Sequence, residues 1–572
     1  MSVIDWIVFV AFLAYVVGDG LRRSRGTKDL EGYFVGGRSI PWWAAGLSIM
    51  ATQASAITVI GTTGQGHDGG MDFVQAYFGL PFAMVLLSIF MVPLYRRLPI
   101  LTAYEYLERR FDARTRTLAS LIFLVSRCLA FGIVIYAPSV VLSALLQIPI
   151  ETTVIAIGVL TTGYTLFGGV NAVIWTDVKQ MLVIVGGLLV VLVILLQRLL
   201  AELDWGGVLT ALGAAGKLNA LEVTPESSVL VPRLAIDEDG PRSFWEEKYN
   251  VWSGLIGGLF LHLAYFGCDQ SQVQRILTNP TARESRMALL MSGFAKVPMQ
   301  LGVLFIGVLL WLFYTVQPGP LLFDPSDRAA AQGNAEVAQL QEQHEALRQR
   351  RVAMVQQIGE QAGPGDVSPD LLRDYQAAVV EARALRERAA EALHGEAKVR
   401  DTNYVFPHFV LTHVPPVLLG LIIAAIFAAA MSSADSTLNS LTAATVVDFY
   451  RRWLKPRATE AQALLASRVV TLCWGAAATV AALSLRGGGS IVEWINKVGS
   501  FFYGSLLGVF ALALLVPGAG PRAGFYGLLG GMTSVLLAHW TVRIEFLWYN
   551  VIGCLGVLAT AGVLRLLGAD RR

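Results

Sequence analysis

An apolar stretch at residues 41–65 contains the sequence Ser48-Ile-Met-Ala-Thr-Gln-Ala-Ser-Ala-Ile-Thr58, and Gly61, Gly64 and Gly66 follow it. The stretch is long enough to cross a membrane, since a spanning helix needs about 20 mostly apolar residues. Its middle is polar, and its end is rich in glycine. This pattern predicts a helix that is interrupted inside the membrane, where free backbone carbonyls can bind an ion.

A second stretch of the same character begins five predicted membrane spans later, at residues 250–269. Its glycines are Gly254, Gly257, Gly258 and Gly267, and Cys268-Asp-Gln270 follows. Interrupted segments at corresponding places in the two halves of a chain are typical of transporters built from an inverted repeat. The two stretches together predict a secondary transporter whose binding sites lie near the middle of the membrane.

The composition supports a membrane protein and argues against other classes. Of 572 residues, 55% are hydrophobic and 15% are charged, whereas about 25% charged residues is usual in soluble proteins. The 44 Lys and Arg residues barely exceed the 42 Asp and Glu residues, so we expect no nucleic-acid partner. The sequence has no Walker A motif, zinc signature or nucleophile elbow, and we therefore expect neither an ATP-driven pump nor an enzyme, and no organic cofactor.

Thirteen apolar segments are candidate membrane spans. They lie at about 4–20, 41–65, 72–95, 116–147, 151–167, 176–198, 250–269, 285–315, 412–447, 461–485, 489–516, 522–540 and 544–567. Loops rich in Lys and Arg, such as 270–287 with Arg275, alternate with loops that lack them, and basic loops stay in the cytoplasm. This pattern predicts an all-α, multi-pass protein of the cell inner (plasma) membrane, with the N-terminus outside and the C-terminus in the cytoplasm.

Residues 317–408 form a predicted insert of different composition. Between 324 and 401 it holds ten Lys or Arg and fourteen Asp or Glu residues, about twice the charge density of the whole chain. Apolar residues at spacings of three and four predict two helices, and Gly363-Pro364-Gly365 predicts the turn between them. We expect an extracytoplasmic helical hairpin that is either a solvated appendage or a docking surface for a partner.

The chain is therefore expected to contain five parts. These are an N-terminal membrane helix and cytoplasmic loop (1–40), the first part of the transporter core with its helices 1–7 (41–316), the insert (317–408), the rest of the core with helices 8–10 (409–516), and the C-terminal membrane helices (517–572).

Polar residues on one face of the span at 412–447 suggest a cation site. The stretch Ala429-Ala-Ala-Met-Ser-Ser-Ala-Asp-Ser-Thr-Leu-Asn439 places Ala429, Ser432, Ser433 and Ser436 on one side of a helix. Hydroxyl and carbonyl oxygens are the ligands that a hard cation prefers, although a face of small residues also serves to pack helices together. Asp435 is harder to explain by packing, because a carboxylate is costly in the membrane.

Two other charged residues lie in or near predicted spans. Asp177 stands in Trp175-Thr-Asp-Val-Lys-Gln180, either as a functional carboxylate or as a cap at the cytoplasmic end of its helix. Lys296 lies about three turns into its span, and either serves the transport pathway or extends its ammonium group to the membrane surface.

Three motifs give the chain a resemblance to a known family. They are Gly169-Gly-Val-Asn-Ala-Val-Ile-Trp-Thr-Asp-Val-Lys-Gln180, Tyr265-Phe-Gly-Cys-Asp-Gln-Ser-Gln-Val-Gln-Arg275 and the Ala429–Asn439 stretch. Through them the sequence resembles the sodium:solute symporters over about residues 40–520, apart from the insert. The resemblance implies a LeuT-type fold of five-plus-five inverted repeats, with Na⁺ as the coupling ion.

The resemblance also implies the ligands of the common sodium site of this family. Backbone carbonyls of the broken first core helix and a small-residue and hydroxyl triplet on the eighth helix hold the ion there. In this chain the corresponding residues are Ala51, Ala54, Ala429, Ser432 and Ser433.

Members of the family that bind a second sodium ion imply a second cation site at Asp177, Ser432, Asp435 and Ser436. Asp435 departs from the family pattern, which usually has Ser or Thr at this position. The extra carboxylate would bind sodium more tightly, carry a proton or pair with Lys296, and the sodium stoichiometry therefore stays open.

The substrate positions match the sugar-transporting members less well. They correspond to Thr58, Tyr77, His262, Tyr265, Lys296 and Asn496. Several acceptor groups of the sugar transporters are missing at these positions, which argues against a sugar. A lysine and a histidine suit an anionic group, and Cys268-Asp-Gln270 is more similar to the vitamin, monocarboxylate and iodide branch.

We therefore expect a sodium-coupled symporter that imports a small organic solute, with a carboxylate or other organic anion favoured. The alternatives are a sodium/sugar symporter, a proton-coupled transporter and a transporter-like membrane sensor. The expected partners are the solute, sodium and the lipid bilayer. The sequence gives neither the identity of the solute nor the oligomeric state.

Overall fold

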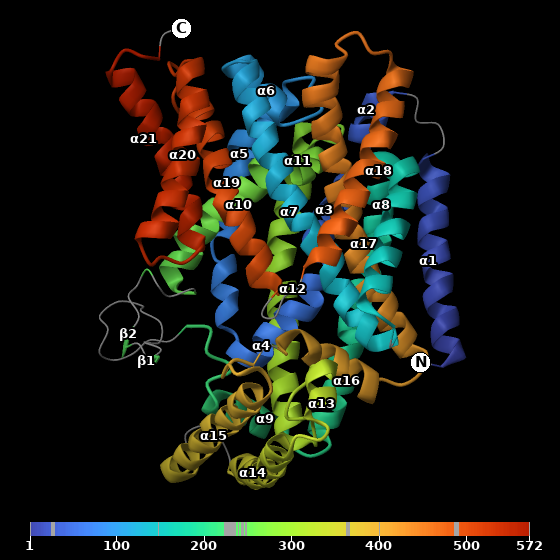
Figure 1. Ribbon diagram of the computed structural model, residues 1–572, viewed down its shortest axis with the longest axis vertical. Coiled ribbons are helices and arrows are strands. Elements are labelled where there is room, and N and C mark those ends of the chain that lie inside the picture. The colour runs from blue at the N-terminus through green and yellow to red at the C-terminus, as the bar shows by residue number, and fades with distance from the viewer. Residues whose placement is uncertain are drawn as a thin grey trace.

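The computed structural model (Figure 1) describes most of the chain. The described residues are 2–24, 29–146, 148–221, 236–237, 240–241, 245, 249–361, 367–399, 401–485 and 491–570. The predicted Gly363–Gly365 turn lies outside them.

The first half of the molecule is a bundle of helices. Its elements are α1 (Val3–Ser24), α2 (Leu30–Val35), η1 (Gly36–Arg38), α3 (Trp42–Gln53), η2 (Thr58–Thr62), α4 (Thr63–Gly69), η3 (Asp72–Tyr77), α5 (Leu80–Arg96), α6 (Tyr104–Arg110), α7 (Ala113–Leu146), α8 (Ile150–Leu200), α9 (Trp205–Ala214), β1 (Ile236–Asp237), β2 (Gly240–Pro241), η4 (Ser253–Gly257), α10 (Gly258–Cys268), α11 (Gln270–Leu277) and α12 (Ala282–Val316). The two short strands pair antiparallel with each other.

The second half contains the insert and the remaining long helices. Its elements are α13 (Pro325–Ala331), α14 (Ala335–Glu360), α15 (Pro369–His394), η5 (Thr402–Tyr404), α16 (Val405–His413), α17 (Leu418–Ala444), η6 (Thr445–Leu454), α18 (Glu460–Ser484), α19 (Ile491–Leu515), α20 (Pro521–Thr541) and α21 (Leu547–Leu566).

The predicted count of thirteen spans is not confirmed. Within the described residues, nine helices are long and apolar enough to cross a membrane, or ten if the bent pair formed by Trp42–Gln53 and Thr58–Gly69 is one span. The other three expected segments are helical, but Ile150–Leu166 and Ser253–Cys268 are shorter, and α20 is not among the long apolar helices. The expected spans 151–167 and 176–198 form the single element α8, which is kinked at Gly169, where φ is +57°.

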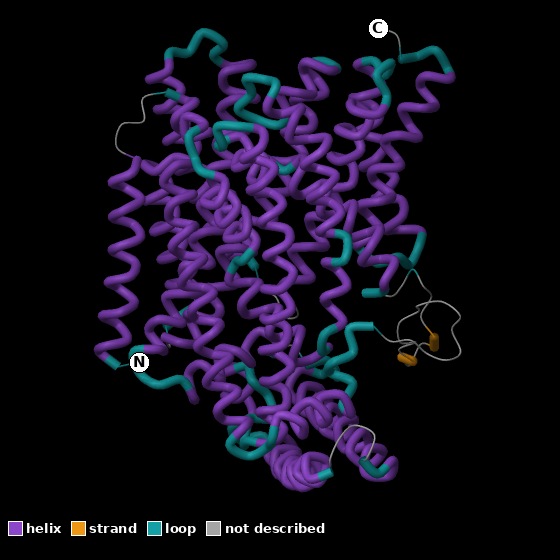
Figure 2. Tube along the Cα trace, turned by 180° about the vertical axis from the view of Figure 1, so that it is seen from behind, coloured by secondary structure: helices purple, strands orange, loops and turns teal. Residues whose placement is uncertain are grey.

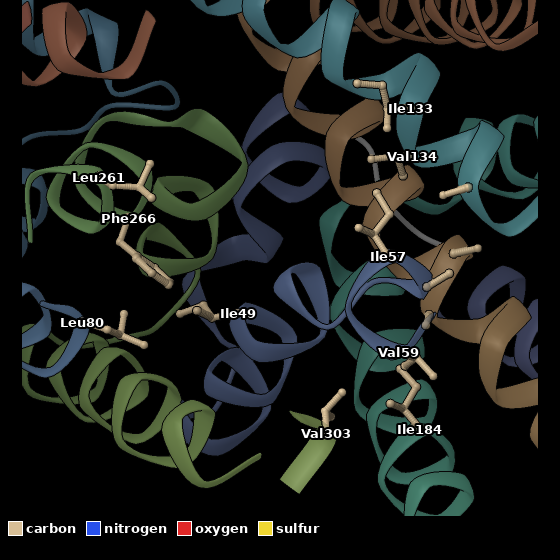
Figure 3. Close-up of a cluster of buried hydrophobic side chains, with 14 of the residues drawn as sticks. Ile49, Ile57, Val59, Leu80, Ile133, Val134, Ile184, Leu261, Phe266 and Val303 are labelled. Carbon is tan, nitrogen blue, oxygen red and sulfur yellow. The ribbon is translucent and has the colours of Figure 1, made fainter. Parts of the chain in front are cut away.

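The interrupted first core helix is present as predicted. α3 ends at Gln53 and the helix resumes at Thr58, with an angle of 63° between the two parts. Ile49 precedes the break and Ile57 follows it, and both belong to the main apolar core, together with Val303 of α12 (Figure 3). Apolar packing on both sides of the break therefore fixes the direction of each half.

The second interruption lies at Asp269, and not among the glycines that suggested it. Asp269 has extended backbone angles between α10 and α11, and its side chain accepts a hydrogen bond from Ser271 N at 2.8 Å. Gly254 has a different role, because a Cβ atom there would lie 2.0 Å from Gln75 O. The glycine allows the backbones of η3 and η4 to pack closely.

The two helices predicted in the insert are α14 and α15, which pack against each other through a small apolar core that includes Leu340, Leu347 and Leu385. The insert also contacts the body of the protein: Arg348 Nη1 donates to Val316 O at 2.5 Å, and Gln376 Nε2 donates to Ala214 O at 3.0 Å. Figures 1 and 2 show it beyond the end of the bundle where the N-terminus lies, with the C-terminus at the opposite end.

The same end of the bundle contains the C-terminal end of α4, the second part of the broken helix. Lys217 Nζ donates to His67 O at 2.8 Å and to Asp68 O at 2.6 Å, which are among the last carbonyls of α4. Burial lowers the pKa of Lys217 to about 8. Thr402 follows the hairpin in the sequence, and its Oγ1 donates to Asp68 Oδ2 at 2.5 Å. Two segments that are distant in sequence therefore hold the C-terminal end of α4.

The first helix stabilises the start of α17. Asp5 Oδ1 accepts hydrogen bonds from Val417 N at 2.7 Å and from Gly420 N at 3.1 Å. α17 has no side-chain cap of its own, and Val417 has a φ of +74°, which is rare for a β-branched residue. Asp5 therefore caps a helix more than 400 residues away.

We predict that Asp5→Ala lowers the free energy of unfolding by about 1–2 kcal/mol, because the first amides of α17 lose their acceptor. The measurement is the thermal unfolding of the purified protein in detergent. Asp19→Ala on the same helix is the control, since Asp19 is partly exposed and pairs with Arg23 and Lys179, and such pairs contribute about 0–1 kcal/mol. Equal effects of the two substitutions would contradict the capping role.

Candidate functional site

The predicted sodium ligands lie where α3 and α17 meet. Ala51 is in the last turn of α3, and Ala54 is the capping residue directly after the helix, so this turn has carbonyls without partners farther along the helix. Ser433 Oγ of α17 donates to Thr52 O at 3.1 Å. The structure therefore brings the hydroxyl face of α17 to the break in α3.

Two members of this set are fully buried and offer different oxygens. Ser432 is fully buried, and its Oγ has no hydrogen-bond partner among the described residues. Ala429 is also fully buried and has only a carbonyl to offer. A buried hydroxyl without a protein partner is costly, and such an oxygen is suited to bind a cation.

Asp177 does not cap its helix at the membrane surface. It lies well inside α8 and is completely buried. Its Oδ2 accepts hydrogen bonds from Ser48 Oγ at 2.5 Å and from Arg275 Nη2 at 3.3 Å. Its Oδ1 has no hydrogen-bond partner among the described residues. The interpretation of Asp177 as an interfacial cap is therefore wrong.

Asp435 does not pair with Lys296, which was one of the three roles considered for it. Its Oδ2 accepts a hydrogen bond from Tyr164 Oη, and its Oδ1 accepts one from Ser436 Oγ at 3.2 Å. Thr52 Oγ1 and Ser436 Oγ also share a hydrogen bond of 3.1 Å. Asp177, Asp435 and Ser436, three of the four residues of the predicted second cation site, thus belong to one buried network.

Arg275 belongs to this network, although it was assigned to a cytoplasmic loop. It lies on α11 and is 1% exposed. Besides its bond to Asp177, its guanidinium donates to Ser48 Oγ at 2.8 Å and to Ser436 Oγ. The polar run Gln270–Arg275 could have indicated this, because so many polar side chains beside an apolar span need partners inside the protein.

Three of the predicted substrate residues lie close together. The rings of Tyr77 and His262 have centroids 5.8 Å apart, and His262 Nε2 lies 3.3 Å from Ala76 O. Lys296 is near enough for its charge to act on His262. Lys296 is 1% exposed and its Nζ has no hydrogen-bond partner among the described residues, so the interpretation that it extends to the membrane surface is wrong.

The other three predicted substrate residues make further contacts of their own. Tyr265 Oη accepts a hydrogen bond from Gln272 Nε2 at 2.9 Å, and the guanidinium of Arg127 lies 5.1 Å from its ring. Thr58 Oγ1 donates to Gln53 O at 2.8 Å and so bridges the break in the helix. Asn496 is partly buried on α19, and the described residues show no hydrogen bond between it and the rest of the set.

Comparisons with known proteins agree with this architecture. The family model described as "Sodium:solute symporter family" matches residues 33–318 and 385–531. The human sodium/iodide cotransporter is 27% identical over 539 residues, covering 93% of this chain and 69% of that protein. The sodium/sialic acid symporter SiaT of Proteus mirabilis (strain HI4320) is 25% identical over 574 residues, covering 100% and 96%.

The fold also matches a solved structure. The structure of a Na⁺-coupled sialic acid symporter, in a substrate-bound outward-open state, superposes with a TM-score of 0.76 at 24% identity. The match covers 100% of this chain and 99% of that one. The two proteins therefore share the same fold over their whole length.

We predict that Tyr164→Phe destabilises the protein by about 1–3 kcal/mol, because a buried carboxyl oxygen of Asp435 would lose its hydrogen-bond donor. Tyr104→Phe is the matched control, since its hydroxyl donates at 3.1 Å to a neutral acceptor, Cys268 O, and should contribute about 0.5–1.5 kcal/mol. Thermal unfolding of both variants is the measurement. A smaller effect for Tyr164→Phe than for Tyr104→Phe would contradict the importance of this buried hydrogen bond.

Proposed function

The chain belongs to the sodium:solute symporter family, and from this premise we propose that it imports a small organic anion together with sodium. The fully buried, unpartnered Ser432 hydroxyl beside the broken helix is the observation that carries the sodium part of the proposal. This hydroxyl is an oxygen ligand of the kind that a hard cation prefers, and it lies near the last backbone carbonyls of α3.

In this proposal one sodium ion binds between the end of α3 and the hydroxyl face of α17. Its ligands are the carbonyls of Ala51 and Ala54 and the oxygens of Ala429, Ser432 and Ser433. Sodium binding joins the broken helix to α17, and this favours the arrangement that also binds the solute, which is a positive coupling between two ligands. Rocking of the core helices against the rest then exposes both ligands to the cytoplasm.

Lys296 supports an anionic solute. A buried ammonium group without a partner is costly in the membrane, and a bound carboxylate would supply its missing counter-charge. His262 lies within range of its charge and has the Tyr77 ring next to it, and these two side chains would contact the rest of the solute. The names of several relatives agree with this choice, since they include symporters of iodide, sialic acid and monocarboxylates.

We place the protein in the inner (plasma) membrane, with the N-terminus and the insert outside and the C-terminus in the cytoplasm. The distribution of Lys and Arg among the loops supports this orientation. Inward movement of each net positive charge then gains about 2.3 kcal/mol per 100 mV of membrane potential. Replacing sodium by choline at fixed pH would separate this proposal from proton coupling.

We predict that carboxylates raise the melting temperature of the purified protein only when sodium is present, because only ligands of the folded state stabilise it. Lys296→Gln should abolish this stabilisation, while Lys497→Gln, at an exposed position of α19, should leave it unchanged. Stabilisation by neutral sugars, and not by carboxylates, would overturn the anionic assignment and favour the sugar alternative.

We predict that Ser432→Ala raises the sodium concentration for half-maximal uptake by about tenfold, which corresponds to about 1.4 kcal/mol. The measurement is uptake into liposomes of a carboxylate that stabilises the protein. Ser440→Ala is the matched control, because Ser440 is on the same helix and its hydroxyl donates to the helix backbone at Thr437 O, at 2.8 Å. An unchanged sodium response of Ser432→Ala would show that the ion binds elsewhere.

A further inference from the structure

One buried arginine of the insert has no counter-charge. Arg351 lies on α14 and is 4% exposed, and its guanidinium has neither a hydrogen bond nor an ion pair with any described residue. Buried charges in proteins are normally paired, because an uncompensated charge away from water is costly. The surroundings of Arg351 are therefore suited to a negatively charged ligand.

The two arginines whose charges act on Arg351 already have carboxylate partners. Arg348 Nη2 pairs with Glu345 Oε1 at 2.6 Å, and Arg386 Nη2 pairs with Asp401 Oδ1 at 2.7 Å. Burial, together with the charges of Arg348 and Arg386, lowers the pKa of Arg351. This group of five side chains thus contains three positive and two negative charges, and one positive charge is left over.

Two neutral side chains within range of this charge have buried polar atoms without a partner. Tyr375 of α15 is fully buried, and His344, two turns before Arg351 on the same face of α14, is 7% exposed. Neither Tyr375 Oη nor His344 Nδ1 has a hydrogen-bond partner among the described residues.

Both of these side chains are uncharged at neutral pH. Burial and the charge of Arg351 lower the pKa of His344 to about 4, and burial raises the pKa of Tyr375. A tyrosine hydroxyl donates one hydrogen bond, and a neutral imidazole donates one when its proton is on Nδ1. Two neutral donors therefore accompany the uncompensated guanidinium.

The three side chains lie where the insert meets the body of the protein. Leu347, one turn before Arg351, belongs to the small apolar core of the insert, whereas Val355, one turn after it, belongs to the main core. Tyr375 also belongs to the main core, and α14 packs against α9 of the body (Figure 1). A ligand shared by α14 and α15 would join the two helices of the hairpin at this junction.

The chemistry of the cluster selects the class of ligand. N–H and O–H donors beside one uncompensated positive charge suit a monovalent anion. The cluster is closely packed, which favours a single atom over an anion with substituents. We propose that the insert binds one chloride ion between Arg351, His344 and Tyr375, and that this ion fastens α14 to α15. The proposal concerns the insert and does not depend on the coupling ion or the solute.

The first test measures amide hydrogen exchange in α14 and α15 of the purified full-length protein in detergent, while chloride replaces gluconate at a fixed sodium concentration. Chloride should slow exchange in these helices by about tenfold, with saturation, because a ligand of the folded state stabilises it. Equal exchange in the two salts would overturn the proposal. Slowing by acetate, but not by chloride, would overturn the choice of a halide.

Substitutions of the arginine test whether its charge binds the ion. Arg351→Met removes the charge and should abolish the effect of chloride, whereas Arg351→Lys keeps the charge and should retain a weaker effect. Arg383→Gln is the matched control, because Arg383 is an exposed arginine of α15 that pairs with Glu387; this variant should respond like the wild type. A full chloride effect in Arg351→Met would show that chloride acts elsewhere.

Tyr375→Phe is a milder variant that keeps the packing of the ring. Its exchange in gluconate should match that of the wild type, because the lost hydroxyl has no partner among the described residues. The chloride concentration for half-maximal slowing should nevertheless rise by about tenfold, since one hydrogen bond to a charged ligand is lost. An unchanged chloride concentration would overturn the proposed set of ligands.

Discussion

The side chain of Arg275 joins the three helices that carry the predicted sodium ligands. It contacts Ser48 on α3, Asp177 on α8 and Ser436 on α17, all within a region closed to water. Removing one partner of such a buried pair typically costs about 3–5 kcal/mol, because the other charge remains uncompensated. The relative positions of the broken helix and the hydroxyl face of α17 therefore depend on one guanidinium, and so does the electrostatic setting in which an ion would bind.

Features that depend on local sequence were predicted well. The break in the first core helix followed from polar residues and glycines within one segment, and the helices of the insert followed from the spacing of apolar residues. The glycines near 254 were misinterpreted, because a glycine serves equally for a bend and for close packing, and only the partner backbone, here Gln75 O, distinguishes the two. The number of spans was also uncertain for a physical reason. A short apolar helix can extend into a neighbouring helix, and the hydropathy of the segment alone does not show this.

Pairings between distant residues could not be predicted. Asp177 and Arg275 are 98 residues apart, and each alone fits an ordinary role at a membrane surface, as a helix cap and as a cytoplasmic basic residue. The same holds for Lys296, whose long side chain could have reached the surface. Burial excluded the membrane-surface alternative for Asp177 and for Lys296, and it corrected the assignment of Arg275 to an exposed loop. The sequence did identify the scarcity of such charges within the membrane, and the residues named for that reason, Asp177, Lys296 and Asp435, are those around which the site is built.

The insert has a practical consequence for imaging. Small membrane proteins are difficult to align in electron micrographs, because a detergent micelle hides most of their features. In this protein the paired helices α14 and α15 extend beyond the bundle (Figure 1), and the bond from Arg348 to Val316 O attaches them to the end of α12. A projection on one side gives each particle a recognisable orientation, and it offers a surface on which an antibody fragment could be raised without covering the proposed ion and solute sites.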